Sequence, residues 1–457
     1  MAYQSVNPTT GEILKTFANH TDAELQSALK VAHALYKSEW SKGPIQPRLD
    51  VLKRLAHLIH DRAEDLARVL AKEMGKRIWE ARGEVAITAG IAHYYAQNAA
   101  TFLAPKKLET SHGESWIEYH PIGVVVAVEP WNFPYYQLIR VAAPNLAVGN
   151  PVLAKHASMV PQAALAFEEL LTAAGAPRGA WTNIFATGEQ IASLIADDRV
   201  QGATLTGSEK AGSIVAAQAG KHIKKSVLEL GGADVFVVLD DANLDKAVKV
   251  GAAARLYNTG QACTAAKRFL VHEAIADRFL DRFTATFSNV RIGDPMDEST
   301  GMGPLCSVAA RDNLAKQVER AVAAGATLHH GGKVIEGPGA FYQPTILTGI
   351  TRENPVYFEE FFGPVAQVYV VRDDDEVIEL ANDSNFGLSG AIFAGDVERA
   401  KALASRIETG SVWINASSST SPELPFGGVK RSGYGRELSE LGIKEFANPK
   451  MVVVAAS

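Results

Sequence analysis

The stretch GVVVAVEP, Gly123–Pro130, decides how the chain is expected to fold, because a short β-branched run ending in a turn is typical of a buried strand. PVLAKHA at Pro151–Ala157 has the same character, and Pro161 can begin a helix that ends near Gly175–Pro177. The segments NIFATG, QGATLTG and KSVLELGG continue the alternation of strand and helix. This alternation predicts βαβ units and a parallel sheet, whose ligands bind beyond the carboxyl ends of its strands.

A second alternating series begins at Asp234. Its expected strands are DVFVVL, KRFLVHE, GAFYQPTIL, VAQVYVV and SVWIN, and its helices begin at Asp245 and Asp277 and cover Asp375–Asn382. The sequence therefore predicts a second α/β domain, and Cys263 falls just before one of its strands.

Roughly the first 100 residues are expected to be helical, beginning with a capping box formed by Thr21 and Glu24. Two other segments, ESWIEYHP at Glu114–Pro121 and MVVVAAS at the C-terminus, have the pattern of exposed strands. Exposed strand edges pair with other chains unless they are covered, so these segments favour an oligomer.

The composition is that of a folded protein, with 47% hydrophobic and 21% charged residues among 457. A net charge of −6 gives no basic surface for nucleic acid, and no apolar run is long enough to span a membrane. The N-terminus lacks the pattern of a signal peptide, and two cysteines cannot build a disulfide framework. The expected compartment is therefore the cytoplasm.

Common cofactor and metal motifs are missing from the sequence. G-x-G-x-x-G and GxxxxGK[ST] do not follow the strands, and HExxH and CxxC are absent, so no metal site is expected. The nearest phosphate-binding signal is LTGSEKAG, in which Gly207 and Gly212 bracket a strand-to-helix turn. A helix N-terminus with Ser208 as a further donor can hold a pyrophosphate, but an ordinary turn has the same pattern.

Three polar residues stand where chemistry is possible. Cys263 is surrounded by small residues in NTGQACTAAKR, which suggests that its thiol is reachable. Glu229 ends an apolar strand in LELGG, and is either an exposed carboxylate or a buried general base. Asn132 in EPWNFP is either a turn-forming residue or an amide that stabilises an oxyanion.

Over essentially its whole length the chain resembles the NAD(P)-dependent aldehyde dehydrogenase superfamily, and its bacterial succinate-semialdehyde branch above all. The motifs that carry the resemblance are, in order, EPWNFP, LTGS, LELGG, NTGQACTAAKR, EEFFGPV, NFGLSG and PFGGVKRSGYGRE. The resemblance implies an α/β fold with a Rossmann-like NAD(P)-binding domain at residues 1–106 and 123–229 and a catalytic domain at 230–437. It also implies a small antiparallel oligomerisation extension, made of 107–122 and 438–457, and a homodimer or homotetramer.

The resemblance assigns roles to four residues of a reaction centre. Cys263 matches the nucleophile that attacks the aldehyde carbon, and Asn132 matches the amide that stabilises the oxyanion. Glu229, which precedes Cys263 by 34 residues, matches the base that activates water to hydrolyse the thioester. Glu437 matches a proton-relaying glutamate, but the lysine that the family usually carries nine residues after Asn132 is Val141 here. A relay through that lysine cannot operate in this chain.

An NAD(P) cofactor is also implied, with Glu360 on the nicotinamide ribose. NAD-specific members often place a glutamate three residues after the position of Lys155, where this chain has Ser158. Without that anion a 2′-phosphate is not repelled, so NADP is favoured over NAD. The positions matching cofactor contacts are Trp131, Lys155, Ser158, Thr206, Gly207, Ser208, Leu230, Glu360 and Phe362.

The expected substrate is an aldehyde, with succinate semialdehyde favoured. Arg140 matches an arginine that binds a distal carboxylate in this branch, although a surface arginine on a helix has the same pattern. The other expected substrate contacts are Tyr136, Tyr257, Thr264 and Ser419. The alternatives are other aldehydes, such as glutarate semialdehyde or aliphatic and aromatic ones, and a cofactor-independent cysteine esterase.

Overall fold

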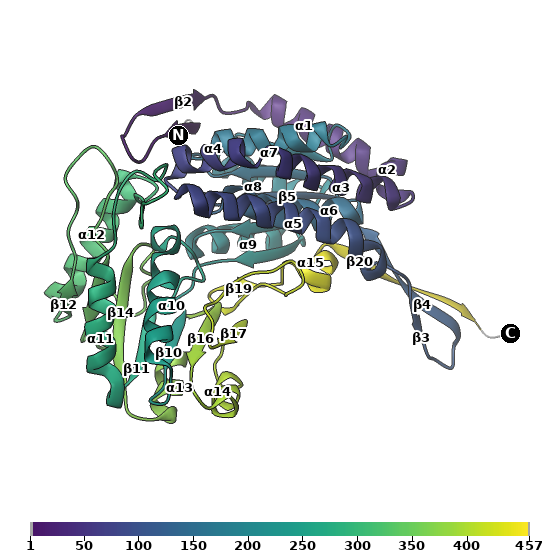
Figure 1. The fold of residues 1–457 in the computed structure, drawn as a ribbon. Coiled ribbons are helices and arrows are strands. Elements are labelled where there is room, and N and C mark those ends of the chain that lie inside the picture. Colours follow the sequence, from purple (N-terminus) through teal and green to yellow (C-terminus); the bar gives the residue numbers. More distant parts are fainter. Residues whose placement is uncertain (1–2, 456–457) are drawn as a thin grey trace.

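The computed structural model describes residues 3–455, so positions 1, 2, 456 and 457 of the expected terminal segments lie outside the described residues. Two sheets form the body of the molecule, one above the other in Figure 1, and a small antiparallel sheet projects from it. The predicted α/β fold with an antiparallel extension is confirmed. The expected domain boundaries stay a prediction.

The strand predicted at GVVVAVEP lies inside the first sheet, with other strands on both sides of it. Its strands are β5 (Val124–Glu129), β6 (Val152–His156), β7 (Trp181–Asn183), β8 (Val200–Thr206), β9 (Lys225–Glu229) and β19 (Gly433–Tyr434). The spatial order is β19-β9-β8-β5-β6-β7, parallel except for β19. Because the order reverses beside β5, ligands are expected at the carboxyl ends of β5 and β8.

Helices cover both faces of this sheet. They are α6 (Pro134–Val148), α7 (Pro161–Ala173), α8 (Gly188–Ala196) and α9 (Glu209–Lys221). Every residue of α6 is buried, since α6 lies between the sheet and the N-terminal helices. The strand expected at NIFATG ends earlier, because the chain leaves the sheet after Asn183.

The second sheet has the order β12-β13-β14-β11-β10-β16-β17, and only β12 is antiparallel to its neighbour. Its strands are β10 (Val235–Val238), β11 (Arg268–His272), β12 (Thr327–His330), β13 (Thr345–Thr348), β14 (Val365–Val371), β16 (Ser389–Phe393) and β17 (Ser411–Ile414). Its helices are α10 (Leu244–Leu256), η1 (Tyr257–Gly260), α11 (Glu273–Ser288), α12 (Val308–Ala323), α13 (Asp374–Asn382) and α14 (Val397–Ala404). The helix expected from Asp277 begins earlier, because the His272 ring caps it through the Ala274 N–H at 3.2 Å.

The N-terminal region is helical after residue 21, and Thr21 and Glu24 form the predicted capping box. Its helices are α1 (Asp22–Tyr36), α2 (Glu39–Lys42), α3 (Gln46–Asp61), α4 (Ala63–Met74) and α5 (Ile78–Phe102). An antiparallel hairpin of β1 (Tyr3–Val6) and β2 (Ile13–Phe17) precedes them, so the expectation of an all-helical start was wrong there. The Tyr3 hydroxyl anchors the hairpin to the loop after β7 by donating to the Ala186 carbonyl at 3.0 Å.

The two predicted exposed strands pair with each other. The small sheet consists of β3 (Lys106–Leu108), β4 (Gly113–Pro121) and β20 (Ala447–Ala455), and it extends away from the body in Figure 1. The remaining elements are β15 (Phe386–Gly387), β18 (Val429–Lys430) and α15 (Ser439–Glu445).

Candidate active site

The predicted reactive residues come together where the chain passes from the first sheet to the second. Asn132 follows β5, Glu229 is the last residue of β9, and Cys263 lies between η1 and β11. The segment after Glu229 leads directly into β10. Residues far apart in the sequence thus meet at the carboxyl edge of the first sheet, as the strand order predicts.

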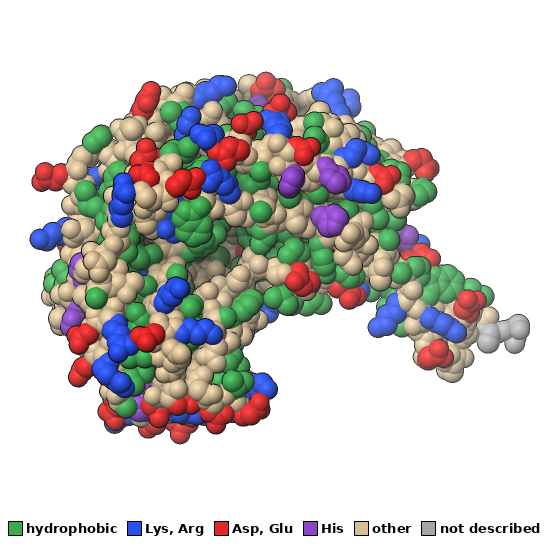
Figure 2. Space-filling model, viewed as in Figure 1, with side chains coloured by type: hydrophobic (Ala, Val, Ile, Leu, Met, Phe, Trp, Pro, Cys, Tyr) green, Lys and Arg blue, Asp and Glu red, His purple; other side chains and the backbone are tan. Residues whose placement is uncertain are grey.

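A cavity of about 590 Å³ opens at this junction, between α5, α6 and α10. The face shown in Figure 2 is hollowed between the upper and lower parts of the molecule. All five predicted substrate contacts line the cavity together with the nucleophile, namely Tyr136, Arg140, Tyr257, Cys263, Thr264 and Ser419. A pocket of this size and lining suits a small molecule.

Cys263 is half-buried, and burial raises the pKa of its thiol to about 12. The nearby cations Lys267 and Arg140 act in the opposite direction but do not offset burial. The thiol is therefore protonated at neutral pH in the protein alone. Because the thiolate is the nucleophile, another positive charge must come close before the site can react.

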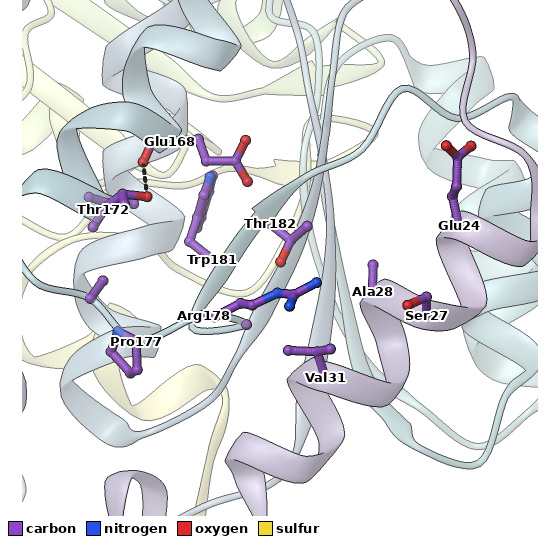
Figure 3. Close-up of a pocket in the computed structure, with 13 residues that line it drawn as sticks. Glu24, Ser27, Ala28, Val31, Glu168, Thr172, Pro177, Arg178, Trp181 and Thr182 are labelled. Carbon is purple, nitrogen blue, oxygen red and sulfur yellow. Dashed lines mark hydrogen bonds between the residues drawn. The ribbon is translucent and has the colours of Figure 1, made fainter.

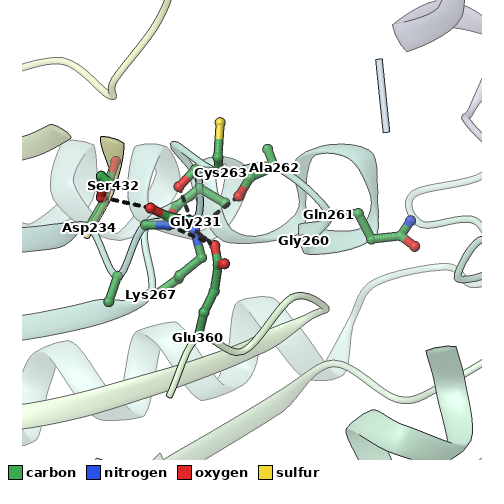
Figure 4. A network of polar contacts seen from close by, with 12 residues as sticks. Gly231, Asp234, Gly260, Gln261, Ala262, Cys263, Lys267, Glu360 and Ser432 are labelled. Carbon is green, nitrogen blue, oxygen red and sulfur yellow. Dashed lines mark hydrogen bonds and ion pairs between the residues drawn. The ribbon is translucent and has the colours of Figure 1, made fainter. Parts of the chain in front are cut away.

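Lys267 holds the loop that carries the nucleophile, and Figure 4 shows its contacts. Its ammonium group donates to the carbonyl oxygens of Ala262 and Cys263 at 3.0 and 2.6 Å, and it lies 3.1 Å from Glu360 Oε1. The same Glu360 oxygen accepts from the Gly232 N–H at 3.1 Å. Sequence reasoning missed Lys267, although its place four residues after Cys263 was a usable signal.

Asn132 lies directly against the nucleophile loop. Its side-chain amide donates to the Gln261 carbonyl at 3.2 Å, two residues before Cys263, and it is 4% exposed. The backbone carbonyl oxygen of Asn132 accepts hydrogen bonds from Lys76 Nζ at 3.0 Å and from Asn258 Nδ2 at 2.9 Å. The amide is therefore held in a fixed orientation near Cys263, as an oxyanion donor requires.

A buried ion pair between Lys76 and Glu84 supports this turn, and sequence reasoning missed it. The Glu84 carboxylate accepts from the backbone N–H groups of Tyr135 and Tyr136 at 2.9 and 3.3 Å, at the start of α6. A carboxylate at a helix N-terminus is stabilised by the helix dipole. The pair thus fixes the start of α6 relative to α5, and with it the Asn132 turn.

Glu229 is buried, so the reading as an exposed strand-end carboxylate was wrong. Neither carboxylate oxygen has a hydrogen-bond partner within residues 3–455, and a side chain on Gly427 would come within 2.6 Å of Oε1. Burial, and next the charge of Glu437, raise the pKa of Glu229 well above its usual value. A carboxyl group with a raised pKa suits general-base work near neutral pH. It does not line the 590 Å³ cavity in this conformation.

Arg140 is 2% exposed, so the alternative of a surface arginine was also wrong. Its Nε lies 2.8 Å from Glu437 Oε2, although the N–H does not point at that oxygen. Its Nη2 donates to Gln137 Oε1 and, at 3.4 Å, to Thr206 Oγ1. The guanidinium therefore faces two sides, with Glu437 on one and the cavity on the other.

The predicted cofactor positions surround the end of the first sheet. The rings of Trp131 and Phe362 meet edge to face at 5.7 Å. Ser208 caps α9 by accepting from the Ala211 N–H at 3.3 Å, while the Gly207 N–H is used by the Glu229 carbonyl. Leu230 is buried against α9, where the missing side chain of Gly212 makes room for it.

Lys155 offers a test of whether an anionic cofactor fits. It is the fourth residue of β6, and its Nζ donates to the His156 carbonyl at 3.4 Å but forms no ion pair within residues 3–455. Burial lowers the pKa of its ammonium group, so a negative partner would stabilise its charge. Ser158 lies three residues further and is half-buried. A phosphate group therefore fits these residues.

Other features of the described residues do not compete with this site. A cavity of about 550 Å³ between α1, α7 and β7 is lined by Glu168, Arg178 and Trp181 among others, but by none of the predicted site residues (Figure 3). Residues 3–455 contain no cluster of side chains that could hold a metal ion. Within the same range, no helix has the length and apolar character needed to cross a membrane.

Comparison with known proteins gives one consistent answer. The chain is 50% identical to "Succinate-semialdehyde dehydrogenase [NADP(+)]" of Deinococcus radiodurans, over 98% of this chain and 94% of that protein. It is 45% identical to the protein of the same name from Mycobacterium avium, over 100% and 98%. The structure of succinic semialdehyde dehydrogenase from Streptococcus pyogenes with NADP+ matches with a TM-score of 0.98 at 48% identity, over the whole of both chains. The sequence model of the aldehyde dehydrogenase family matches residues 1–452, and this chain belongs to that family.

Proposed function

We propose that this protein oxidises succinate semialdehyde to succinate, with NADP+ as the oxidant and water as the second substrate. The observation that carries the proposal is the single cavity that holds both the Cys263 thiol and the Arg140 guanidinium. A short aldehyde with a distal carboxylate matches a nucleophile and a fixed cation in one pocket. The names of the relatives from Deinococcus radiodurans and Mycobacterium avium support the same substrate and cofactor.

In the proposed reaction Cys263 attacks the aldehyde carbon, and the oxyanion receives hydrogen bonds from the Asn132 amide and the Cys263 backbone N–H. NADP+ supplies the hydride acceptor, and its positive charge favours the thiolate over the thiol. The acyl group stays on Cys263 as a thioester. Glu229 then takes a proton from the water that hydrolyses this thioester, and the acid leaves.

The proposed cofactor contacts divide into two groups. Lys155, Ser158 and the N-terminus of α9 would hold the phosphates, because they present a cation, a hydroxyl and free N–H groups. Glu360 would accept the ribose hydroxyls at the nicotinamide end, while Trp131 and Phe362 border that region. Thr206 and Leu230 complete the set. A Cβ at position 231 would collide with the Glu360 carboxylate, so the glycine there lets Glu360 keep its place.

Replacing Ser158 with glutamate is expected to reverse the cofactor preference. A carboxylate there repels the 2′-phosphate of NADP, whereas the 2′-hydroxyl of NAD can donate to it. We expect kcat/KM with NADP to fall about tenfold or more, and the value with NAD to stay level or rise. Initial rates with both cofactors measure this, and Ser158→Ala is the control that removes the hydroxyl alone. A glutamate variant that keeps the wild-type ratio of the two values contradicts the assignment.

Replacing Arg140 with alanine is expected to separate carboxylated from uncharged aldehydes. Without the guanidinium a distal carboxylate has no partner, so we expect kcat/KM for carboxylated aldehydes to fall about tenfold or more. The same change leaves Glu437 without its cation, so both kinds of substrate lose rate. The informative quantity is therefore the ratio of kcat/KM for succinate semialdehyde to that for butyraldehyde. An unchanged ratio contradicts the proposed clamp.

The proposed function is tested by initial rates of wild-type protein with four aldehydes. These are succinate semialdehyde, glutarate semialdehyde, an aliphatic aldehyde and benzaldehyde, each with NADP and with NAD. We expect the highest kcat/KM for succinate semialdehyde with NADP. A higher value for another aldehyde contradicts the substrate, and ester hydrolysis without cofactor at a comparable rate favours the esterase.

The proposal includes the assembly and organisation of the chain. Exposed apolar residues on β20, including Met451 and Val454, suit a homodimer or homotetramer in which another copy covers them. We propose that residues 1–106 and 123–229 bind NAD(P) and that residues 230–437 form the catalytic domain. Two free thiols suit a reducing compartment such as the cytoplasm.

A further inference from the structure

The proton that Glu229 takes from water needs a way out of the protein. Glu229 and Glu437 are 3% and 6% exposed. A base that stays protonated cannot act again, so each turnover requires that its proton reach solvent. Val141, on the same side of α6 as Arg140 and Asn145, offers no ionisable group for this transfer.

Glu229 and Glu437 are brought together by one turn of the chain. Gly427 lies against the Glu229 carboxylate, and its neighbour Phe426 exchanges two backbone hydrogen bonds with Glu437, at 2.8 and 2.7 Å. After burial, the charge of Glu437 is the strongest influence on the pKa of Glu229. Glu437 is therefore placed to receive a proton from Glu229.

A cavity of about 10 Å³ is lined by both Glu437 and Glu445. This is about the room that one water molecule needs, provided that polar groups surround it. The polar residues that line it are Arg140, Asn145, Thr204, Arg436 and the two glutamates. Glu437 Oε2 has no hydrogen-bond donor within residues 3–455, so a water here would have a partner.

Glu445 connects this cavity with the surface. It is the last residue of α15, and its side chain is 22% exposed. One carboxylate oxygen accepts from the Arg436 N–H at 2.8 Å, and the other lies 3.5 Å from the exposed Lys225 ammonium group. The carboxylate thus borders the cavity and also reaches solvent.

We propose that Glu445 is the exit of a proton path that runs from Glu229 through Glu437 and one water in this cavity to the protein surface. The path rests on the hydrolytic step of the proposed function. Glu445 touches neither substrate nor cofactor and acts through Glu437.

The transfers balance without any further reactant. An O–H bond of water breaks, its oxygen bonds to the acyl carbon, the C–S bond breaks and Cys263 keeps the electron pair. Glu229 holds the released proton and passes it to Glu437. The cavity water takes that proton while giving one of its own to Glu445, which releases it to solvent.

Glu445→Gln tests the path, because glutamine keeps an acceptor for the Arg436 N–H but does not take up a proton. We expect an unchanged rate of the first NADPH burst, since hydride transfer precedes hydrolysis. The steady-state kcat should fall about tenfold. The solvent deuterium isotope effect on kcat should rise, since proton transfer becomes rate-limiting.

Two further variants separate the path from a structural role. Glu440→Gln changes a glutamate of the same helix that pairs with Lys444 and does not line the cavity, and it should behave as wild type. Val141→Ile fills the cavity but keeps both carboxyl groups, and it should lower kcat while leaving the burst intact. Burst kinetics and deuterium isotope effects are measured for all three variants.

The proposal is overturned if Glu445→Gln matches Glu440→Gln in kcat and isotope effect, or if its burst slows as much as its turnover. Wild-type kcat in Val141→Ile also overturns it. If the wild-type protein prefers another aldehyde, the proposed substrate is wrong but the proton path is not. The variants are then compared with that aldehyde as the substrate.

Discussion

Replacement of Cys263 by alanine is expected to reduce NADPH formation from succinate semialdehyde to below about a hundredth of the wild-type rate. No thioester can form without the thiol. The rest of the cavity wall, including Arg140 and the Asn132 turn, is unaffected by the loss of a half-buried sulfur atom. Steady-state rates measure the loss, and thermal unfolding with and without NADP+ shows whether the fold and cofactor binding persist.

Cys306→Ala is the matched control for this variant. Cys306 is 4% exposed and lies outside the 590 Å³ cavity, and its backbone N–H donates to Gln261 Oε1 at 2.8 Å. It should keep most of the activity. Residual turnover above a hundredth of wild type in Cys263→Ala, in a folded protein, would rule out Cys263 as the nucleophile.

Glu229→Gln is expected to separate the two halves of the reaction. Glutamine has nearly the same shape but cannot take a proton from water, so the thioester forms and then persists. We expect a burst of about one NADPH per site followed by turnover slowed about 10²–10⁴-fold. Stopped-flow measurement of NADPH shows both phases.

The pH dependence of the hydrolysis rate is a second measurement that tests the role of Glu229. Burial and the charge of Glu437 hold the pKa of Glu229 well above its usual value, and only the ionised form is a base. The wild-type hydrolysis rate should therefore rise with pH through this raised pKa, and Glu229→Gln should lose that rise. Glu168→Gln changes a half-buried glutamate of the cavity in Figure 3; this variant is the control and should keep the rise. A Glu229→Gln variant without any burst would place Glu229 in an earlier step.

Much of the fold could be predicted because its strands are buried on both faces. Runs such as Val124–Glu129 and Val235–Val238 can be recognised from local sequence alone, since burial on both faces leaves almost only apolar residues. The hairpin of β1 and β2 could not be recognised in this way. Its second strand is mostly exposed, and it is held by long-range contacts such as the Tyr3 hydrogen bond to Ala186.

The site was predictable only as a set of residues. Motif order identified Cys263, Asn132 and Glu229, but local sequence does not encode the contacts that orient them. Lys76, with Glu84, supports the Asn132 turn from a distant helix, because burial of an ion pair requires both partners to meet in the folded chain. Likewise the pairing of Arg140 with a glutamate 297 residues further along the chain is a property of the tertiary structure.

The central claim is that a succinyl group is carried on Cys263 after hydride transfer. Mass spectrometry of peptides from Glu229→Gln, mixed with succinate semialdehyde and NADP+ and quenched in acid, tests it directly. The peptide that contains Cys263 should gain the mass of one succinyl group, and only when NADP+ is present. An unmodified Cys263 peptide after a full NADPH burst, or a succinyl group on another residue, would contradict the account.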